Sequence, residues 1–162
     1  MQADTGRAGQ AATAINVHHT GMSVARLDDA LAFWEAFLGV PARWRTVLDR
    51  PYLGRHIGYP GIKINAAFID LPGGNTLELL DYQTEKKPLP DATANPGNVH
   101  ICLTVEDAGI AWKRAVDCGA RPIVAEGPVD IDGGPNKGAR AAYLRIHDGI
   151  TLELFQPGRK AG

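Results

Sequence analysis

Two nearly identical hexapeptides place a carboxylate in the middle of an apolar, strand-like run. They are NTLELL at residues 75–80 and ITLELF at residues 150–155, and the carboxylates belong to Glu78 and Glu153. A charged side chain is costly to remove from water unless a partner compensates for it. We therefore expect each of these carboxylates to meet a compensating cation in the folded protein.

A second repeated segment adds two histidines. HTGMSV at residues 19–24 aligns without gaps with HICLTV at residues 100–105, so that His19 corresponds to His100. Alternate residues of a strand share one face, and both histidines fall on the polar face of their strand. Imidazole nitrogen and carboxylate oxygen are ligands that suit Zn, Ni, Co, Mn or Fe(II). If the strand faces curve toward each other, His19, Glu78, His100 and Glu153 form a candidate set of ligands for one divalent metal ion.

A structural role is the alternative interpretation of the same residues. Each histidine could simply hydrogen-bond a glutamate, and duplication could have copied that pair. The histidines are separated by 81 residues (100 − 19) and the glutamates by 75 residues (153 − 78). Because both ligand types recur at matching places in both halves, a shared site is favoured over coincidence.

The elements that would position these side chains also repeat. Each half contains a strand, a helix that stops at a glycine, and then three strands without a helix between them, which favours an α+β fold with largely antiparallel pairing over a parallel α/β sheet. The expected strands are 15–24, 42–49, 62–71, 75–82, 98–105, 121–126, 139–146 and 150–157, and the expected helices are 26–39 and 106–119. We predict two tandem βαβββ modules that form a cupped, mostly antiparallel sheet around a metal site.

The module boundaries follow from composition. The first residues are rich in Gly, Ala and polar residues, and a stretch in the middle of the chain carries three prolines and no periodicity. The expected division is a flexible N-terminal tail at 1–14, a first module at 15–83, a linker at 84–97, a second module at 98–157 and a C-terminal tail at 158–162.

Composition narrows the class of partner. The formal net charge is −1, which gives no electrostatic reason to expect nucleic acid or an anionic membrane. No apolar run is long enough to span a bilayer, and the N-terminus lacks the apolar centre of a secretory signal, so a soluble, cytoplasmic protein is expected. Cys102 and Cys118 form no disulfide framework and are expected to be buried free thiols.

The quoted motifs resemble the vicinal oxygen chelate superfamily. The resemblance covers residues 15–157 and is carried by two pairs of motifs. The first pair is HTGMSVARLDDALAFWEAFLGV with a downstream LELL, and the second is HICLTVED with a downstream DGITLELFQP. The superfamily includes glyoxalase I, methylmalonyl-CoA epimerase, extradiol dioxygenases, and fosfomycin and bleomycin resistance proteins. The resemblance implies paired βαβββ modules with a metal between them, held by His19, Glu78, His100 and Glu153. Relatives pair their modules within one chain or across a dimer, and a homodimer that binds a small-molecule substrate is expected here.

The number of ligands favours one branch of the superfamily. Extradiol dioxygenases use two histidines and one carboxylate, whereas Glu78 supplies a fourth ligand and leaves two octahedral positions for a bidentate substrate. This resembles the glyoxalase I and epimerase branch, in which a Lewis-acidic metal stabilises an enediolate. The resemblance implies that Glu153 is the leading candidate for the catalytic base, and that Glu78 would act on the opposite face of the substrate. An Fe(II) extradiol-type dioxygenase and a non-catalytic small-molecule binding or resistance protein remain the alternatives.

Candidate substrate contacts lie in two irregular segments. Residues 126–140 are Gly-rich and form either a solvated loop or a mobile lid whose Lys137 or Arg140 meets an anionic group. Arg50 lies just before a second irregular segment, and it is likewise either a solvated residue or a contact for an anionic group. His147, beside an Asp-Gly turn, is expected to be exposed.

Overall fold

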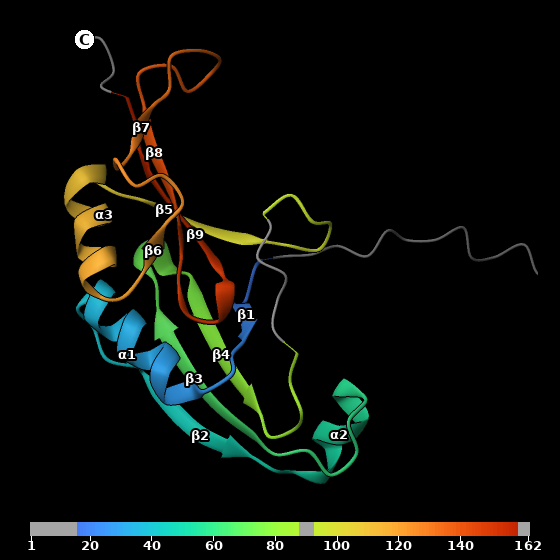
Figure 1. The fold of residues 1–162 in the computed structure, drawn as a ribbon. Coiled ribbons are helices and arrows are strands. Elements are labelled where there is room, and N and C mark those ends of the chain that lie inside the picture. Colours follow the sequence, from blue (N-terminus) through green and yellow to red (C-terminus); the bar gives the residue numbers. More distant parts are fainter. Residues whose placement is uncertain (1–15, 88–92, 159–162) are drawn as a thin grey trace, which may run out of the picture.

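The computed structural model describes residues 16–87 and 93–158. The predicted N-terminal tail, residues 88–92 of the predicted linker and residues 159–162 of the predicted C-terminal tail lie outside these ranges. The first half contains β1 (Thr20–Ser23), α1 (Leu27–Leu38), β2 (Trp44–Leu48), α2 (Pro51–Ile57), β3 (Ile64–Asp70) and β4 (Thr76–Tyr82). The second half contains β5 (His100–Thr104), α3 (Ala108–Asp117), β6 (Arg121–Pro122), β7 (Val129–Asp130), β8 (Arg140–Arg145) and β9 (Thr151–Gln156) (Figure 1).

The strands form two sheets with the same topology. The first has the order β1-β4-β3-β2 and the second the order β5-β9-β8-β6, with β7 added beside β8. β1 runs parallel to β4, and β5 runs parallel to β9. All other strand pairs are antiparallel. The predicted α+β class, the tandem modules and the mostly antiparallel pairing are therefore confirmed.

Both predicted helices form, and their glycines act as expected. At the end of α1, Gly39 adopts φ 77° and its N–H donates to the carbonyl of Glu35, a geometry that favours glycine because it has no Cβ. After α3, Cys118 caps the helix and Gly119 takes φ 100°. Among residues 16–87 and 93–158, no helix has both the length and the apolar character that a bilayer-spanning segment requires.

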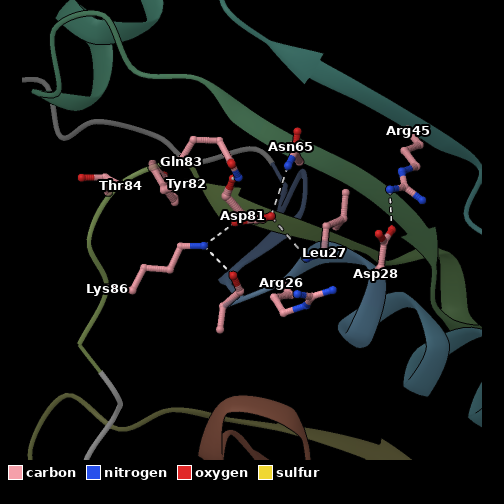
Figure 2. Close-up of a pocket in the computed structure, with 11 residues that line it drawn as sticks. Arg26, Leu27, Asp28, Arg45, Asn65, Asp81, Tyr82, Gln83, Thr84 and Lys86 are labelled. Carbon is pink, nitrogen blue, oxygen red and sulfur yellow. Dashed lines mark hydrogen bonds and ion pairs between the residues drawn. The ribbon is translucent and has the colours of Figure 1, made fainter.

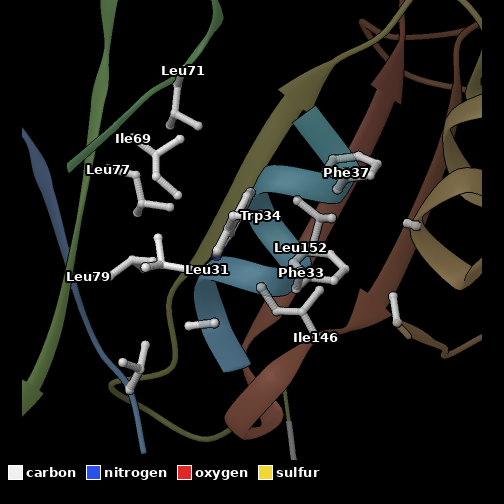
Figure 3. Close-up of a cluster of buried hydrophobic side chains, with 14 of the residues drawn as sticks. Leu31, Phe33, Trp34, Phe37, Ile69, Leu71, Leu77, Leu79, Ile146 and Leu152 are labelled. Atoms are coloured by element: carbon white, nitrogen blue, oxygen red, sulfur yellow. The ribbon is translucent and has the colours of Figure 1, made fainter. Parts of the chain in front are cut away.

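One hydrophobic core joins the two modules, with α1 between the two sheets. Figure 3 shows Leu31 and Trp34 directed toward Leu77 and Leu79 of β4, while Phe33 and Phe37 lie on the side of α1 that faces the second module. Trp34 is completely buried, as expected for a core tryptophan. The modules are thus packed back to back through their helix sides, and the opposite face of each sheet points outward.

Three local features differ from the sequence prediction. The expected strand 121–126 is limited to β6, since Pro122 has no N–H to donate to a ladder and the chain turns at Gly127, where φ is 113°. The irregular segment 126–140 contains the short strand β7, which pairs with β8. The chain at 51–57, expected to be irregular, forms the short helix α2 with Pro51 in its first turn.

Helix α2 covers part of the outward face of the first sheet. Its buried Leu53 packs with Ile64 and Ala66 of β3, and Leu80 and Tyr82 of β4 lie against the same small cluster. Leu80 and Tyr82 alternate with the core-facing residues of β4, so they share a face with Glu78. The outward face of the first sheet is therefore closed by α2 at one end and open around Glu78.

Candidate metal centre

The first His–Glu pair lies at the β1 edge of the first sheet. The parallel register places Gly21 beside Glu78, and His19 precedes β1 by one residue. The Nε2 atom of His19 lies 3.1 Å from Oε2 of Glu78, whose side chain is only 16% exposed. Leu77 and Leu79 on either side of Glu78 are fully buried on the other face. His19, predicted on the polar face of the strand 15–24, lies outside β1, but its ring is next to the Glu78 carboxylate.

The second module repeats this geometry. His100 is the first residue of β5, and Cys102 lies beside Glu153 of β9 in a parallel register. The Nε2 atom of His100 lies 3.0 Å from Oε2 of Glu153, whose side chain is 17% exposed. Both cysteines are free thiols, but neither is buried as expected: Cys102 is exposed on the outward face of β5, and Cys118 is half-buried.

Each pair fits a divalent metal ion by donor type and by spacing. Two ligand atoms that lie at right angles around an ion, each about 2.1 Å from it, are separated by about 3 Å. The nitrogen–oxygen distances in both pairs match this separation. Imidazole and carboxylate are also the donors that Zn, Ni, Co, Mn and Fe(II) accept. The donor types and spacing of each pair are thus compatible with half of the predicted four-ligand set.

The two pairs do not meet within one chain. In the parts of the chain that the structure describes, no group of three or more His, Cys, Asp or Glu side chains could hold a metal ion. The reason is the back-to-back packing, which places the shared core between the two outward faces. A four-ligand site made of both pairs thus requires a second protein chain.

The surroundings of the two glutamates differ. Antiparallel pairing places Phe68 of β3 beside Glu78, and Tyr143 of β8 beside Glu153. The hydroxyl of Tyr143 lies 3.5 Å from Nε2 of His100. Partial desolvation, followed by the charge of Glu153, raises the pKa of Cys102 to about 11 and also raises the pKa of Tyr143.

An aromatic surface lies next to Glu78. The ring centroid of Phe68 is 6.0 Å from that of His19 and 5.0 Å from that of Trp44, and Trp44 is 39% exposed. The guanidinium of Arg43 lies 5.7 Å from the Phe68 ring centroid. The outward face of the first sheet is thus more aromatic than that of the second at the same level.

The predicted substrate contacts lie on separate elements. Arg140 forms an ion pair with Asp130 of β7 over 3.0 Å, and strand alternation places it on the opposite face of β8 from Tyr143. Lys137 lies in the exposed turn between β7 and β8, and Arg50 directly precedes α2. Their role in substrate binding stays a prediction.

Two cavities lie near the start of α1. The smaller, of about 560 Å³, surrounds the buried carboxylate of Asp81, which accepts hydrogen bonds from Asn65, from Lys86 and from the Leu27 N–H (Figure 2). Burial alone would raise the pKa of Asp81, but these hydrogen bonds outweigh it and lower the pKa. Because the Arg26 side chain makes no capping hydrogen bond, Asp81 serves as the cap of α1, a contact that sequence spacing does not reveal.

The larger cavity, of about 860 Å³, lies between the modules. It is lined by Ser23 and Tyr82 from the outward face of the first sheet, and by Arg121 and Ile150 from the second module. Its volume is in the range of small-molecule binding sites.

Two tandem βαβββ modules with a His–Glu pair on each outward face define a protein of glyoxalase-like architecture. Residues 18–143 match the family model of the Glyoxalase/Bleomycin resistance protein/Dioxygenase superfamily, and the chain belongs to this superfamily. The match confirms the resemblance to the vicinal oxygen chelate proteins at the level of the superfamily.

Solved structures share the fold. A glyoxalase family protein from Bacillus cereus has a TM-score of 0.76 at 21% identity, covering 94% of this chain and 100% of its own. A glyoxylase/bleomycin resistance protein/dioxygenase domain from Frankia has a TM-score of 0.65 at 19% identity, covering 93% and 96%. A glyoxalase/dioxygenase from Nostoc punctiforme has a TM-score of 0.55 at 18% identity, covering 90% and 92%. A comparison with curated proteins finds no significant match.

Proposed function

We propose that the protein is a metal-dependent lyase or isomerase of the glyoxalase I type, which moves a proton on a small metabolite with two vicinal oxygens. The observation that carries this proposal is the repeated His–Glu pair, with nitrogen–oxygen distances of 3.1 and 3.0 Å in the two modules. Four such ligands occupy four positions of an octahedral ion and leave two for a bidentate substrate.

The chemistry divides between the ion and the side chains. A bound divalent metal would act as a Lewis acid toward the substrate oxygens. His19 and His100 would hold the ion. A ligand carboxylate, Glu78 or Glu153, would take the proton from the carbon next to the carbonyl and return it, as general base and then general acid.

The complete site would form between two copies of the chain. Because the pairs face outward from a shared core, the His19–Glu78 pair of one protomer needs the second pair from its partner. β1 and β5 are edge strands of their sheets, and each is preceded by an exposed valine, Val17 at 74% and Val99 at 81% exposure. Open edges flanked by exposed apolar side chains favour association with another chain. A homodimer in which β1 of one protomer approaches β5 of the other would complete the ligand set and cover the open strand edges.

A ring-cleaving Fe(II) dioxygenase is the second candidate. It is supported by the aromatic surface next to Glu78, formed by the exposed Trp44 and the half-buried Phe68, which suits a flat ring. A dioxygenase would consume oxygen and should tolerate the loss of Glu78, whereas the proton-transfer enzyme should not.

Metal titration tests the proposal. Protein purified without chelators should bind one divalent ion per chain, measured by calorimetry with Co²⁺ and by elemental analysis, because a symmetric dimer has two sites. His19→Ala should weaken binding at least about 100-fold, since a ligand is lost. His56→Ala, which removes an exposed histidine of α2, is the matched control and should bind like wild type. Less than about half an equivalent of bound metal would rule out both enzyme functions.

A further inference from the structure

We propose that His18 is a positioning residue for His19: its ring hydrogen-bonds Nδ1 of His19 both without and with a bound metal, and so keeps Nε2 of His19 directed toward Glu78. This inference rests on the proposed function, because His19 is one of the proposed ligands. It gives a role to a side chain outside the repeated ligand set, and it makes the two modules unequal.

The two histidines meet through the nitrogen of His19 that the proposed site does not use. Nδ1 of His18 lies 2.7 Å from Nδ1 of His19, within the range of a hydrogen bond. The ring centroids are 5.0 Å apart and the ring planes meet at 83°. On the other side of the same ring, Nε2 of His19 lies 3.1 Å from Oε2 of Glu78. Both nitrogens of His19 are therefore engaged, and the contact with His18 restricts the rotation of the ring.

The partners decide where the ring protons lie when no metal is bound. A neutral imidazole carries one N–H, and its other nitrogen accepts. The ionised carboxylate of Glu78 can only accept, so Nε2 of His19 carries the proton of that ring. Nδ1 of His19 is then an acceptor, and His18 must donate to it from its own Nδ1. The metal-free protein should thus contain His18 with its proton on Nδ1.

The roles reverse when Nε2 of His19 serves as a ligand. The lone pair of Nε2 would then be in use, so the proton of His19 would lie on Nδ1 and would be donated to His18. His18 would accept through Nδ1 and carry its own proton on Nε2. An imidazole can act as donor or acceptor at the same nitrogen without changing its charge, whereas a carboxylate in this place could only accept. A histidine therefore suits a partner that must hold His19 in both states.

The second module has no equivalent side chain. The residue before His100 is Val99, at the position that corresponds to His18, and a valine side chain forms no hydrogen bond. Within residues 16–87 and 93–158, the hydrogen-bonding contacts of the His100 ring are at Nε2, including the Tyr143 hydroxyl at 3.5 Å. The ring of His19 is thus held at both nitrogens, and the ring of His100 at one.

NMR of the ring nitrogens tests the hydrogen bond in the absence of metal. At pH 8 histidine side chains are ordinarily neutral, and ¹⁵N–¹H correlation spectra show which nitrogen is protonated. In protein treated with a chelator, His18 should carry its proton on Nδ1. The exposed His56 of α2 should mainly show the Nε2–H form that histidine favours in water. A His18 ring with the same pattern as His56 overturns the proposal.

Saturation with Zn²⁺ tests the reversal. His18 should change to the Nε2–H form, while the proton of His19 should appear on Nδ1. A His18 ring that keeps its proton on Nδ1 with bound Zn²⁺ contradicts the proposal. A protein that binds no Zn²⁺ would instead reject the proposed function, and the metal-free spectrum would still decide whether His18 holds His19.

Substitution of His18 tests its effect on metal affinity. His18→Ala should weaken Co²⁺ binding by about 10-fold, as measured by calorimetry. His18→Asn should recover most of this loss, because its amide can accept through oxygen or donate through nitrogen from about the place of Nδ1. His56→Ala is the matched control and should bind like wild type. Wild-type affinity in His18→Ala, or equal losses in the alanine and asparagine variants, would show that His18 does not position His19.

Discussion

At the residue level, His147 connects the two modules. Its Nε2 accepts a hydrogen bond of 3.0 Å from the buried indole N–H of Trp34 in the first module, and its Nδ1 lies 3.1 Å from a carboxylate oxygen of Asp148. The same Asp148 accepts a hydrogen bond from the Ala25 N–H across the module boundary. The side chain of His147 is 10% exposed, so the expectation that it is exposed was wrong. The Asp-Gly turn reaches the surface, but the preceding histidine packs on α1.

Burial of His147 should make folding stability depend on pH. Burial lowers the pKa of His147 below the ordinary histidine value of about 6.5, although Asp148 and Asp29 oppose the shift. Below pH 6.5 the unfolded chain binds the proton more readily than the folded one, so this contribution to stability is complete above that pH and declines as pH falls. We expect urea unfolding between pH 8 and pH 5 to show this decline in wild type.

His147→Gln isolates this contribution, because the glutamine oxygen can still accept the Trp34 hydrogen bond without titrating. The variant should lose less free energy of unfolding than wild type as pH falls. His56→Gln, at an exposed position, should keep the wild-type slope. Identical slopes for wild type and His147→Gln would show that His147 does not link pH to folding.

At the level of the element, α2 depends on close backbone contact at Gly54. A Cβ at this position would lie 2.8 Å from the carbonyl oxygen of Tyr59 and 2.9 Å from Cα of Pro60. Real Cβ atoms do not approach backbone that closely, so any larger residue must displace the 59–61 loop or the helix. Leu53, the neighbour of Gly54, covers Ile64 and Ala66, so the position of α2 determines how one end of the Glu78 face is closed.

Gly54→Ala should therefore reduce the free energy of unfolding by about 1–3 kcal/mol, as measured by urea denaturation. Gly133→Ala is the matched control, because a Cβ there meets no atom within 4 Å. This control should change stability by less than about 0.5 kcal/mol. A Gly54→Ala variant as stable as the control would mean that α2 packs differently from the arrangement described above.

At the level of the whole molecule, the back-to-back packing limits how the proposed metal site could be completed. Each outward face carries one His–Glu pair, and α1 with the shared core lies between the two faces. In a two-fold symmetric dimer, each site would take one pair from each protomer. Pairing of the two modules within one chain would instead require the core around Trp34 to open.

Mixing two inactive variants distinguishes these arrangements. His19→Ala/Glu78→Gln and His100→Ala/Glu153→Gln should each bind no metal tightly. After subunit exchange, half of the dimers are mixed, and each mixed dimer regains one intact site, so the mixture should bind about a quarter of an equivalent of Co²⁺ per chain. Light scattering, measured in parallel, tests whether the variants and their mixture are dimers. Absence of any recovered binding, with exchange verified, would contradict a site shared between protomers.

Features that depend on near neighbours along the chain could be predicted from the sequence. Strand alternation predicted which face of its strand each polar side chain takes, and the terminal glycines predicted where α1 and α3 end. The repeated segments predicted the tandem modules, and the quoted motifs identified the superfamily. These inferences succeed because the period of a strand or helix is a local property of the chain.

Features that depend on contacts between distant segments could not be predicted in this way. The tertiary structure placed Phe68 beside Glu78 and Tyr143 beside Glu153, because the register between strands is not contained in the pattern of either strand. It also turned the two ligand faces away from each other by packing α1 against both sheets. Alternation along a strand assigns a side chain to one face of the sheet. The direction in which that face points depends on which apolar surfaces bury one another when the whole chain folds.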